Sequence, residues 1–154
     1  MSKKLAIIAT KGTLDWGYPP FILASTAAAL GYDVQVFFTF YGLQLLKKKL
    51  DLQVTSLGNP GMPMPMPMPV LLQALPGMQG MMTSMMKKKM ADKGVADLGE
   101  LRELCQEADV KFIACQMTVD LFEMDPKEFI DGVEYAGAAM FFEFAGESDI
   151  CLFI

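Results

Sequence analysis

Short apolar runs alternate along the chain with segments of helical spacing. The first run, Leu5–Thr10, is almost entirely apolar, which is typical of a strand buried on both faces of a sheet. Pro19 and Pro20 suit the first turn of a helix, and Gly31 suits the position just past its end. Val34–Phe40 is rich in β-branched and aromatic residues and predicts a second strand.

The later segments continue this order of strands and helices. They predict helices at Gly42–Leu50, Val70–Met90 (interrupted at Pro76–Gly77), Leu98–Ala108, Thr118–Glu123 and Ala138–Phe144, strands at Val110–Cys115, Gly132–Tyr135 and Ile150–Ile154, and a turn capped by Asp125 ahead of Pro126, with Glu128 at the capping-box spacing. Strands that alternate with helices run parallel and are joined by right-handed crossovers. We therefore expect an α/β fold, a three-layer α/β/α arrangement with a mainly parallel sheet of about five strands, in one domain over residues 1–154.

A Met/Pro-rich insertion occupies residues 58–90, approximately. Within it, Gly61–Pro69 alternates methionine and proline, and each proline disfavours the α region in the residue before it, so an extended chain is expected. Further on, methionines recur at spacings of three and four, at Met78, Met81, Met82, Met85 and Met86. Such a stripe suits core or oligomer packing, a sticky surface for a membrane or partner, or capture of Cu(I) by thioethers. Because it is so apolar, we expect this segment to pack between subunits or over the active-site end.

Composition narrows the class of protein. The 154 residues are 53% hydrophobic, enough for a sizeable core. Trp16–Tyr32 is uncharged, but its glycine and prolines make a buried globular helix the better interpretation than a membrane span, so at most weak membrane association is expected. The net charge of −5 argues against nucleic-acid binding, which needs a basic face.

The charge is divided unevenly along the chain. Residues 1–90 hold nine lysines and three acidic residues, whereas residues 91–154 hold four basic and fifteen acidic residues. Either the second half has solvated helix faces, or the surface is polarised in a way that steers an assembly partner.

The chain contains no histidine. This excludes a Ser–His–Asp triad, a Cys–His pair and a histidine-ligated zinc or haem within one chain. Any chemistry must rest on cysteine, carboxylates, lysine, hydroxyls or backbone amides, and we expect no metal and no organic cofactor.

Cys115 is the first candidate for reactivity. It ends a predicted parallel strand, where open α/β sheets place their ligands, and a helix capped by Thr118 is expected to follow. Amides at a helix start favour a thiolate, Lys11 at the end of the first strand could reinforce this effect, and Asp120 would oppose it if it points inward. The alternative is an inert, buried cysteine.

The other two thiols are expected in the core. Cys105 shares an apolar helix face with Leu101 and Leu104, and Cys151 lies within the last strand. The chain shows no secretory signal and has an odd number of cysteines, so we expect reduced thiols and a cytoplasmic location.

The loop Thr10–Tyr18 joins the first strand to the first helix. Gly12 and Gly17 permit tight turns there, and the helix start could receive an anion. The loop is neither a G-x-G-x-x-G motif nor a P-loop, so an ordinary βα connection is the alternative.

Two blocks of sequence carry a family resemblance. The first runs from Ile7-Ile-Ala-Thr-Lys-Gly12 through Gly31-Tyr-Asp-Val to Phe37-Phe-Thr-Phe-Tyr-Gly42, and the second comprises Ile113-Ala-Cys-Gln-Met-Thr118 and Asp131-Gly-Val-Glu-Tyr-Ala-Gly-Ala-Ala139 with a terminal hydrophobic strand. Together they resemble the DsrE/DsrF/DsrH-like sulfur-relay family, in the subgroup often labelled peroxiredoxin-like. The peroxidase label fits badly, because no peroxiredoxin-type Pro/Thr/Cys segment is visible. The resemblance implies a parallel α/β/α fold, homo- or hetero-oligomers, and a persulfide on the strand-end cysteine, which corresponds to Cys115.

The resulting hypothesis is a sulfur carrier, or possible sulfurtransferase, that holds a persulfide on Cys115 and relays it to a partner thiol. Its candidate substrate- or anion-binding residues are Lys11, Gly12, Thr13, Asp15, Trp16, Gln116, Met117 and Thr118. We expect Thr10 and Cys115 at the same edge of the sheet, and a homo-oligomer that meets a sulfur donor or acceptor protein. The alternatives are a non-catalytic oligomeric binding module that uses the Met-rich segment, and a Cu(I)-binding protein.

Overall fold

The computed structural model describes residues 1–55, 66 and 69–154. In this part of the chain five strands form one parallel sheet in the order β4-β3-β2-β1-β5. The strands are β1 (Lys4–Ala9), β2 (Asp33–Phe38), β3 (Lys111–Cys115), β4 (Val133–Ala136) and β5 (Ile150–Phe153). The predicted α/β class and parallel sheet are confirmed. β2 ends two residues before the predicted end because Phe40 adopts a left-handed φ of 48°, which no strand can continue.

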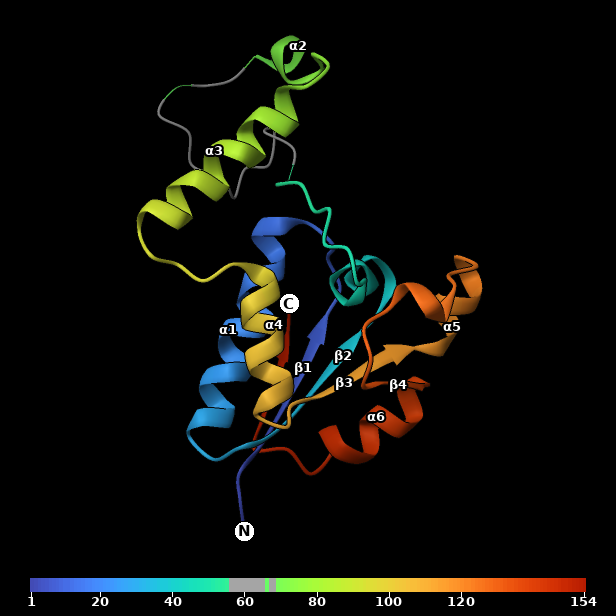
Figure 1. The fold of residues 1–154 in the computed structure, drawn as a ribbon. Helices are drawn as coiled ribbons and strands as arrows, with labels where there is room; N and C mark the ends of the chain where they lie inside the picture. Colours follow the sequence, from blue (N-terminus) through green and yellow to red (C-terminus); the bar gives the residue numbers. More distant parts are fainter. Residues whose placement is uncertain (56–65, 67–68) are drawn as a thin grey trace.

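Helices cover both faces of the sheet (Figure 1). α1 (Leu14–Ala29) and α4 (Leu98–Glu107) pack together on one face, and α6 (Ala138–Ala145) lies on the other. The shorter elements are the 3₁₀ helices η1 (Phe40–Leu46) and η2 (Pro126–Glu128), with α2 (Val70–Gln73), α3 (Met78–Asp92) and α5 (Gln116–Leu121). The three predicted layers are therefore present.

Strand alternation divides the buried residues into two cores. The strand residues that face α1 and α4 are Leu5, Ile7, Ala9, Val34, Val36, Phe38, Phe112 and Ala114. Those that face α6 are Ala6, Phe37, Ile113, Cys115 and Ala136, packed with Phe141 of α6. The reactive-thiol candidate consequently belongs to the α6 face.

The first helix begins earlier than predicted. α1 starts at Leu14, and Pro19 and Pro20 lie inside it rather than in its first turn. Burial explains why the two prolines are tolerated, since Leu14, Gly17 and Tyr18 of the early turns are already in the core. Gly31, with φ of 84°, follows the helix end as predicted.

The predicted helix at Gly42–Leu50 is instead the shorter 3₁₀ helix η1. It ends at Leu46 because the guanidinium of Arg102 donates hydrogen bonds to the carbonyl oxygens of Leu45 at 2.9 Å and Lys47 at 2.7 Å. Gly42 lets this element lie directly against the end of β1, since a Cβ at Gly42 would collide with the carbonyl oxygen of Ala9.

The caps in the second half follow the predicted chemistry in part. The carboxylate of Asp125 accepts a hydrogen bond from the Lys127 amide at 2.9 Å and caps η2 as expected. Glu128 does not close a capping box, because its carboxylate pairs with the Lys47 ammonium at 3.1 Å. α4 matches the predicted helix and carries a complete capping box between Asp97 and Glu100.

The Met-rich segment contains two helices among its described residues, α2 and α3. α2 and α3 are separated at Pro76–Gly77, as predicted. The expected single stripe is divided: Met82, Met86 and Met90 pack against the core, whereas Met81 and Met85 are exposed. The Met-Pro repeat at 61–69 lies outside the described residues except for 66 and 69. Within the described ranges, no helix is both long and apolar enough to cross a membrane.

Candidate functional site

Cys115 lies at the junction between β3 and α5. α5 begins at Gln116, so Cys115 itself occupies the position before the helix. Thr118 was predicted to cap this helix, but it lies in the first turn instead. The chain turns directly from strand into helix, and this brings the Cys115 thiol close to the first free amides. The Cys115 residue is only 4% exposed.

Hydrogen-bond donors surround the Cys115 sulfur. Burial raises the pKa of the Cys115 thiol, but this is outweighed by hydrogen bonds from the hydroxyl and backbone amide of Thr118, the hydroxyl of Thr39 and the amide of Met117, so the pKa is lowered overall. Hydrogen bonds made to the charged form favour that form. The site thus increases the fraction of thiolate, the nucleophilic form of cysteine.

Thr39 reaches the site because of strand register. Phe38 of β2 pairs with Ala114 of β3, so the next residues, Thr39 and Cys115, are neighbours, and alternation places Thr39 with Phe37 on the α6 face. The hydroxyl oxygens of Thr39 and Thr118 lie 3.3 Å apart. Sequence reasoning missed Thr39 because the predicted strand ran past it to Phe40.

The loop after β1 lies at the same edge of the sheet, which confirms the expected placement of Thr10 with Cys115. Ala9 pairs with Phe38, and Phe38 with Ala114, so Thr10 and Cys115 both follow the same row of the sheet. One strand separates them.

The candidate residues of that loop, however, line a cavity that does not include Cys115. A cavity of about 540 Å³ is lined by Lys11, Gly12, Thr13, Trp16, Tyr41, Gln44 and Thr55. The Lys11 ammonium lies 4.1 Å from the centre of the Trp16 ring, a cation–π contact. Cys115 is not part of this lining, because its side chain faces α6 whereas Trp16 belongs to α1 on the opposite face.

Asp15 is held by its own hydrogen bonds. Its carboxylate accepts from the backbone amide of Thr55 at 2.9 Å and from the Thr55 hydroxyl at 2.7 Å. Partial burial raises the pKa of the Asp15 carboxyl, but the hydrogen bonds from Thr55 and the Thr13 hydroxyl outweigh it and lower the pKa overall. Asp15 thus ties the start of α1 to the segment before the insertion through Thr55.

The residues that follow Cys115 point in different directions. The side-chain amide of Gln116 donates a hydrogen bond to the carboxylate of Asp120 at 2.8 Å, and both side chains are exposed. Asp120 therefore does not point inward. The side chain of Met117 is also exposed, whereas Thr118 is fully buried.

The remaining cysteines differ from each other. Cys105 is fully buried, as predicted, and donates to the carbonyl oxygen of Phe21 at 3.4 Å, and burial raises its pKa to about 12. Leu104, which was predicted to share the apolar helix face with Cys105, is 50% exposed instead. Cys151 was expected in the core and is exposed, since the face of edge strand β5 on which it lies is not covered.

An aromatic cluster lies beside the Cys115 end of the sheet. Tyr41 and Phe122 stack with ring centres 5.9 Å apart, and Phe40 meets Phe122 edge-on at 6.0 Å. The amide of Phe40 donates to the Thr118 hydroxyl at 3.2 Å, so the cluster is bonded directly to the thiol's environment. Sequence reasoning did not select these residues; the signal that points to Phe40 and Tyr41 is their position just after a strand that neighbours β3.

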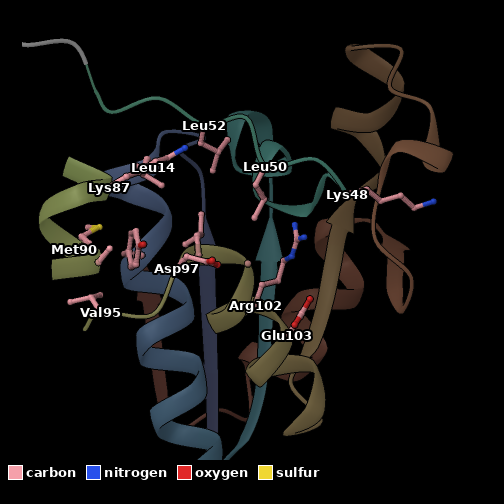
Figure 2. A pocket seen from close by; sticks show the side chains of 14 residues that line it. Leu14, Lys48, Leu50, Leu52, Lys87, Met90, Val95, Asp97, Arg102 and Glu103 are labelled. Atoms are coloured by element: carbon pink, nitrogen blue, oxygen red, sulfur yellow. The ribbon is translucent and has the colours of Figure 1, made fainter. Parts of the chain in front are cut away.

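A second cavity lies on the α1 face (Figure 2). It has a volume of about 480 Å³ and is bounded by α1, α3 and α4, with Arg102 and Lys87 among its polar residues and Leu50, Leu52 and Met90 among its apolar ones. Arg102 is mostly buried there, and burial lowers its pKa. This cavity is separated from Cys115 by the sheet.

Comparison with known proteins places the chain among relatives of similar length. It is 81% identical over 156 residues to the sulfur carrier protein DsrE2 of Allochromatium vinosum, covering 99% of this chain and 98% of that protein. It is 33% identical over 158 residues to the uncharacterized protein YrkE of Bacillus subtilis, with the same coverage. The crystal structure of the ychN protein from E. coli matches the whole fold with a TM-score of 0.56 at 12% identity, covering 100% of both chains. Residues 1–153 match the DsrE/DsrF/DrsH-like family, and the chain therefore belongs to that family.

Proposed function

We propose that this protein is a sulfur carrier that holds a persulfide on Cys115 and passes the outer sulfur to a thiol of a partner protein. Two facts support the proposal: the relative that shares 81% of its residues is named a sulfur carrier protein, and the surroundings of Cys115 favour a thiolate. The lowered pKa of Cys115 is the observation on which the chemistry depends.

Loading is a simple thiol exchange. The Cys115 thiolate attacks the terminal sulfur of a donor persulfide or polysulfide, a sulfur–sulfur bond forms at Cys115, and the donor's sulfur–sulfur bond breaks with its electron pair left on the donor. No oxidant or reductant is consumed. The hydroxyls of Thr39 and Thr118 and the amide of Met117 are positioned to solvate the anion.

Delivery uses the same atoms in reverse. A partner thiolate attacks the outer sulfur, and the bond to Cys115 breaks, leaving the Cys115 thiolate. The donors that stabilise this thiolate make Cys115 a good leaving group, because thiols of lower pKa leave faster. The site therefore assists both steps. In this account the transfer is a relay between proteins in a reducing compartment, which we take to be the cytoplasm.

The loop residues Lys11, Gly12, Thr13 and Trp16 have a separate role in this proposal. Their cavity opens beside Tyr41, which also lines the groove next to Phe122. We assign them to the approach of the donor or acceptor rather than to direct solvation of the Cys115 anion.

A cyanolysis assay tests the function. Protein treated with polysulfide and desalted should release thiocyanate in proportion to bound sulfane sulfur, and Cys115→Ser should release none, while Cys151→Ser, an exposed thiol on the same sheet face, should match the unmodified protein. Equal release from Cys115→Ser and the unmodified protein would refute the proposal.

We also propose that the protein self-associates through the α6 face. Parallel sheets are almost always covered on both sides, yet only α6 covers this face among the described residues. Phe142 on α6 and Phe153 on β5 are 64% and 73% exposed. Contact with a second copy would bury them.

A further inference from the structure

Arg102 of α4 is a buried cation without a counter-ion. The residue is only 7% exposed, and no carboxylate of the described residues lies within ion-pair distance of it. Taking a charge out of water costs free energy, and this cost is offset when the charge is paired with an opposite one. An anion from outside the chain would supply the missing partner.

Only part of the Arg102 guanidinium is used to hold the fold. Its Nη1 donates to the carbonyl oxygens of Leu45 at 2.9 Å and Lys47 at 2.7 Å. Its Nε and Nη2 bond to no acceptor within the described residues, and neither atom is sealed from solvent. The N–H groups of these two nitrogens point in the same direction and form the fork that matches both oxygens of a carboxylate. The unused side of Arg102 is thus suited to a carboxylate.

The cavity that Arg102 lines also has a large apolar wall. Its volume of about 480 Å³ lies within the range that small organic molecules occupy in proteins. The guanidinium points toward Leu50, and Met90 lies on the α3 side (Figure 2). The other large apolar residues of the lining are Leu14, Leu52, Val95 and Leu98. An apolar wall with one forked cation suits a ligand that has an apolar body and one anionic group.

The other charged residues of the lining bear on the sign of the ligand. Lys87 extends from α3 toward α1, whereas Lys48 points away from the cavity (Figure 2). The Asp97 carboxylate is engaged in the cap of α4, where it accepts from a backbone amide of the first turn at 2.9 Å. Glu103 is exposed and forms no ion pair with any cation of the described residues. Arg102 and Lys87 are therefore the charged groups left to bind a ligand, and both favour an anion.

From these observations we propose that the cavity bounded by α1, α3 and α4 binds a small monocarboxylate with an apolar chain. The carboxylate accepts hydrogen bonds from Nε and Nη2 of Arg102 and is attracted by the Lys87 ammonium, while the chain packs against Leu50 and Met90. The site lies on the opposite face of the sheet from Cys115. It is thus a second binding function, and it does not depend on the proposed sulfur transfer.

Octanoate and two matched compounds test this proposal. Isothermal titration calorimetry on the full chain compares octanoate, below its micelle concentration, with octanol, which lacks the charge, and acetate, which lacks the chain. We expect octanoate to bind about tenfold more tightly than octanol, because octanol cannot form the charge-assisted pair with Arg102. Acetate should show no saturable binding, because it buries no apolar chain. Octanol that binds as tightly as octanoate, or no binding of octanoate, would overturn the proposal.

Nuclear magnetic resonance locates the bound octanoate. The methyl signals of Leu50 and Met90 should shift as octanoate is added and should saturate at the same concentration, because both residues line the cavity. The methyl signals of Leu71, which is exposed on α2 and outside the lining, should stay in place. Shifts confined to the residues around Lys11 and Trp16 would place octanoate in the other cavity and would overturn the proposal.

Variants identify the groups that bind the carboxylate. Arg102→Lys keeps a cation but loses the fork, so it should weaken octanoate binding by about tenfold and leave octanol binding as it is. Lys87→Gln should weaken octanoate binding by about threefold, a smaller effect because Lys87 is exposed. Lys88→Gln, at an exposed lysine of α3 outside the lining, is the matched control and should bind octanoate normally.

The two variants of the site are independent tests. Arg102 also holds the end of η1, so Arg102→Lys is compared with the unmodified protein by urea denaturation before binding is measured. If Arg102→Lys does not fold, Lys87→Gln and the methyl shifts still decide the question. Unchanged octanoate affinity in a folded Arg102→Lys, or equal affinity in Lys87→Gln and Lys88→Gln, would overturn the proposal.

Discussion

Thr39 and Thr118 lie 79 residues apart in the chain, yet their hydroxyl oxygens are 3.3 Å apart. Each side chain also donates to Cys115 and favours its thiolate. The parallel register of β2 and β3 brings the two together, since it aligns the ends of both strands. The reactivity of the thiol is therefore a property of the sheet edge and not of the cysteine's local sequence alone.

Removing the Thr118 hydroxyl should make Cys115 less reactive. Thr118→Val should raise the pKa of Cys115, because a hydrogen-bond donor to the thiolate is lost. Alkylation by a small reagent at neutral pH should then slow about fivefold, since one hydrogen bond contributes a net free energy of about 1 kcal/mol. Thr39→Val should act in the same direction. The pH profile of alkylation should move to higher pH, and an unchanged profile would contradict the assignment. Thr26→Val on the exposed side of α1 is the matched control.

The three thiols should differ in their access to reagents, and the pKa is raised for Cys105 and lowered for Cys115. Cys105 is fully buried with a pKa raised to about 12, so it should react only when the protein unfolds. Cys151, which is exposed, should react with bulky maleimides. Cys115 should react with small reagents and resist bulky ones, because it is only 4% exposed. Digestion and mass spectrometry after timed labelling distinguish the three, and rapid labelling of Cys105 in native protein would be inconsistent with the structure.

Asp15 should contribute pH-dependent stability. Because its pKa is lowered in the folded protein from 3.8, its contribution is fully present above that value and is lost as the pH falls through the lower folded value. Asp15→Asn should therefore unfold at a lower urea concentration than the unmodified protein at pH 7. The difference between the two urea midpoints should be smaller at about pH 2 to 3. Asp51→Asn, at an exposed carboxylate, serves as the comparison. An equal deficit at both pH values would rule out this explanation.

Alanine substitutions at two glycines should have opposite effects on the free energy of unfolding. Gly42→Ala places a Cβ against the carbonyl oxygen of Ala9 and should cost about 1–3 kcal/mol of unfolding free energy. Gly80→Ala on α3 meets no atom within 4 Å and should stabilise the helix by about 0.5–1 kcal/mol. Chemical denaturation measures both, and a stable Gly42→Ala would disprove the close approach of η1 to β1.

The proposed contact between two subunits through the α6 face can be tested by placing a charged side chain in it. Phe142→Arg would bury a charge at the subunit contact and should shift the protein toward monomer in light scattering. Phe142 is 64% exposed, so the fold of one subunit should tolerate the change. Met85→Arg, an exposed apolar residue of α3, is the control. An identical mass for both variants and the unmodified protein would argue against this contact.

The order of elements was predictable because the apolar runs are short and clearly separated. Strand-end placement of Cys115 followed from the same pattern. The same pattern did not predict which face of the sheet each side chain occupies, because a shift of one residue moves a side chain to the other face. Lys11 and Cys115 were therefore expected to share a site, although Trp16, which contacts Lys11, and Cys115 face opposite layers. The early start of α1 was missed because two prolines are a stronger local signal than the burial that offsets them.

Tertiary context also decided the short elements. η1 ends where Arg102 of α4 binds its last carbonyl oxygens, a contact 57 residues away along the chain that no local pattern shows. Cys151 is exposed because the sheet has an edge at β5, and strand order is invisible in a run of apolar residues.

The most direct test of the account is to locate the sulfur atom itself. Native protein is treated with polysulfide, free thiols and persulfides are blocked with a small alkylating reagent, and the peptides that contain Cys105, Cys115 and Cys151 are compared by mass spectrometry with and without prior reduction. The account predicts an added mass of one sulfur on the Cys115 peptide, its removal by reductant, and its loss in Cys115→Ser with the fold intact by circular dichroism. Sulfur that resides mainly on Cys151, or that remains at full level in Cys115→Ser, would contradict it.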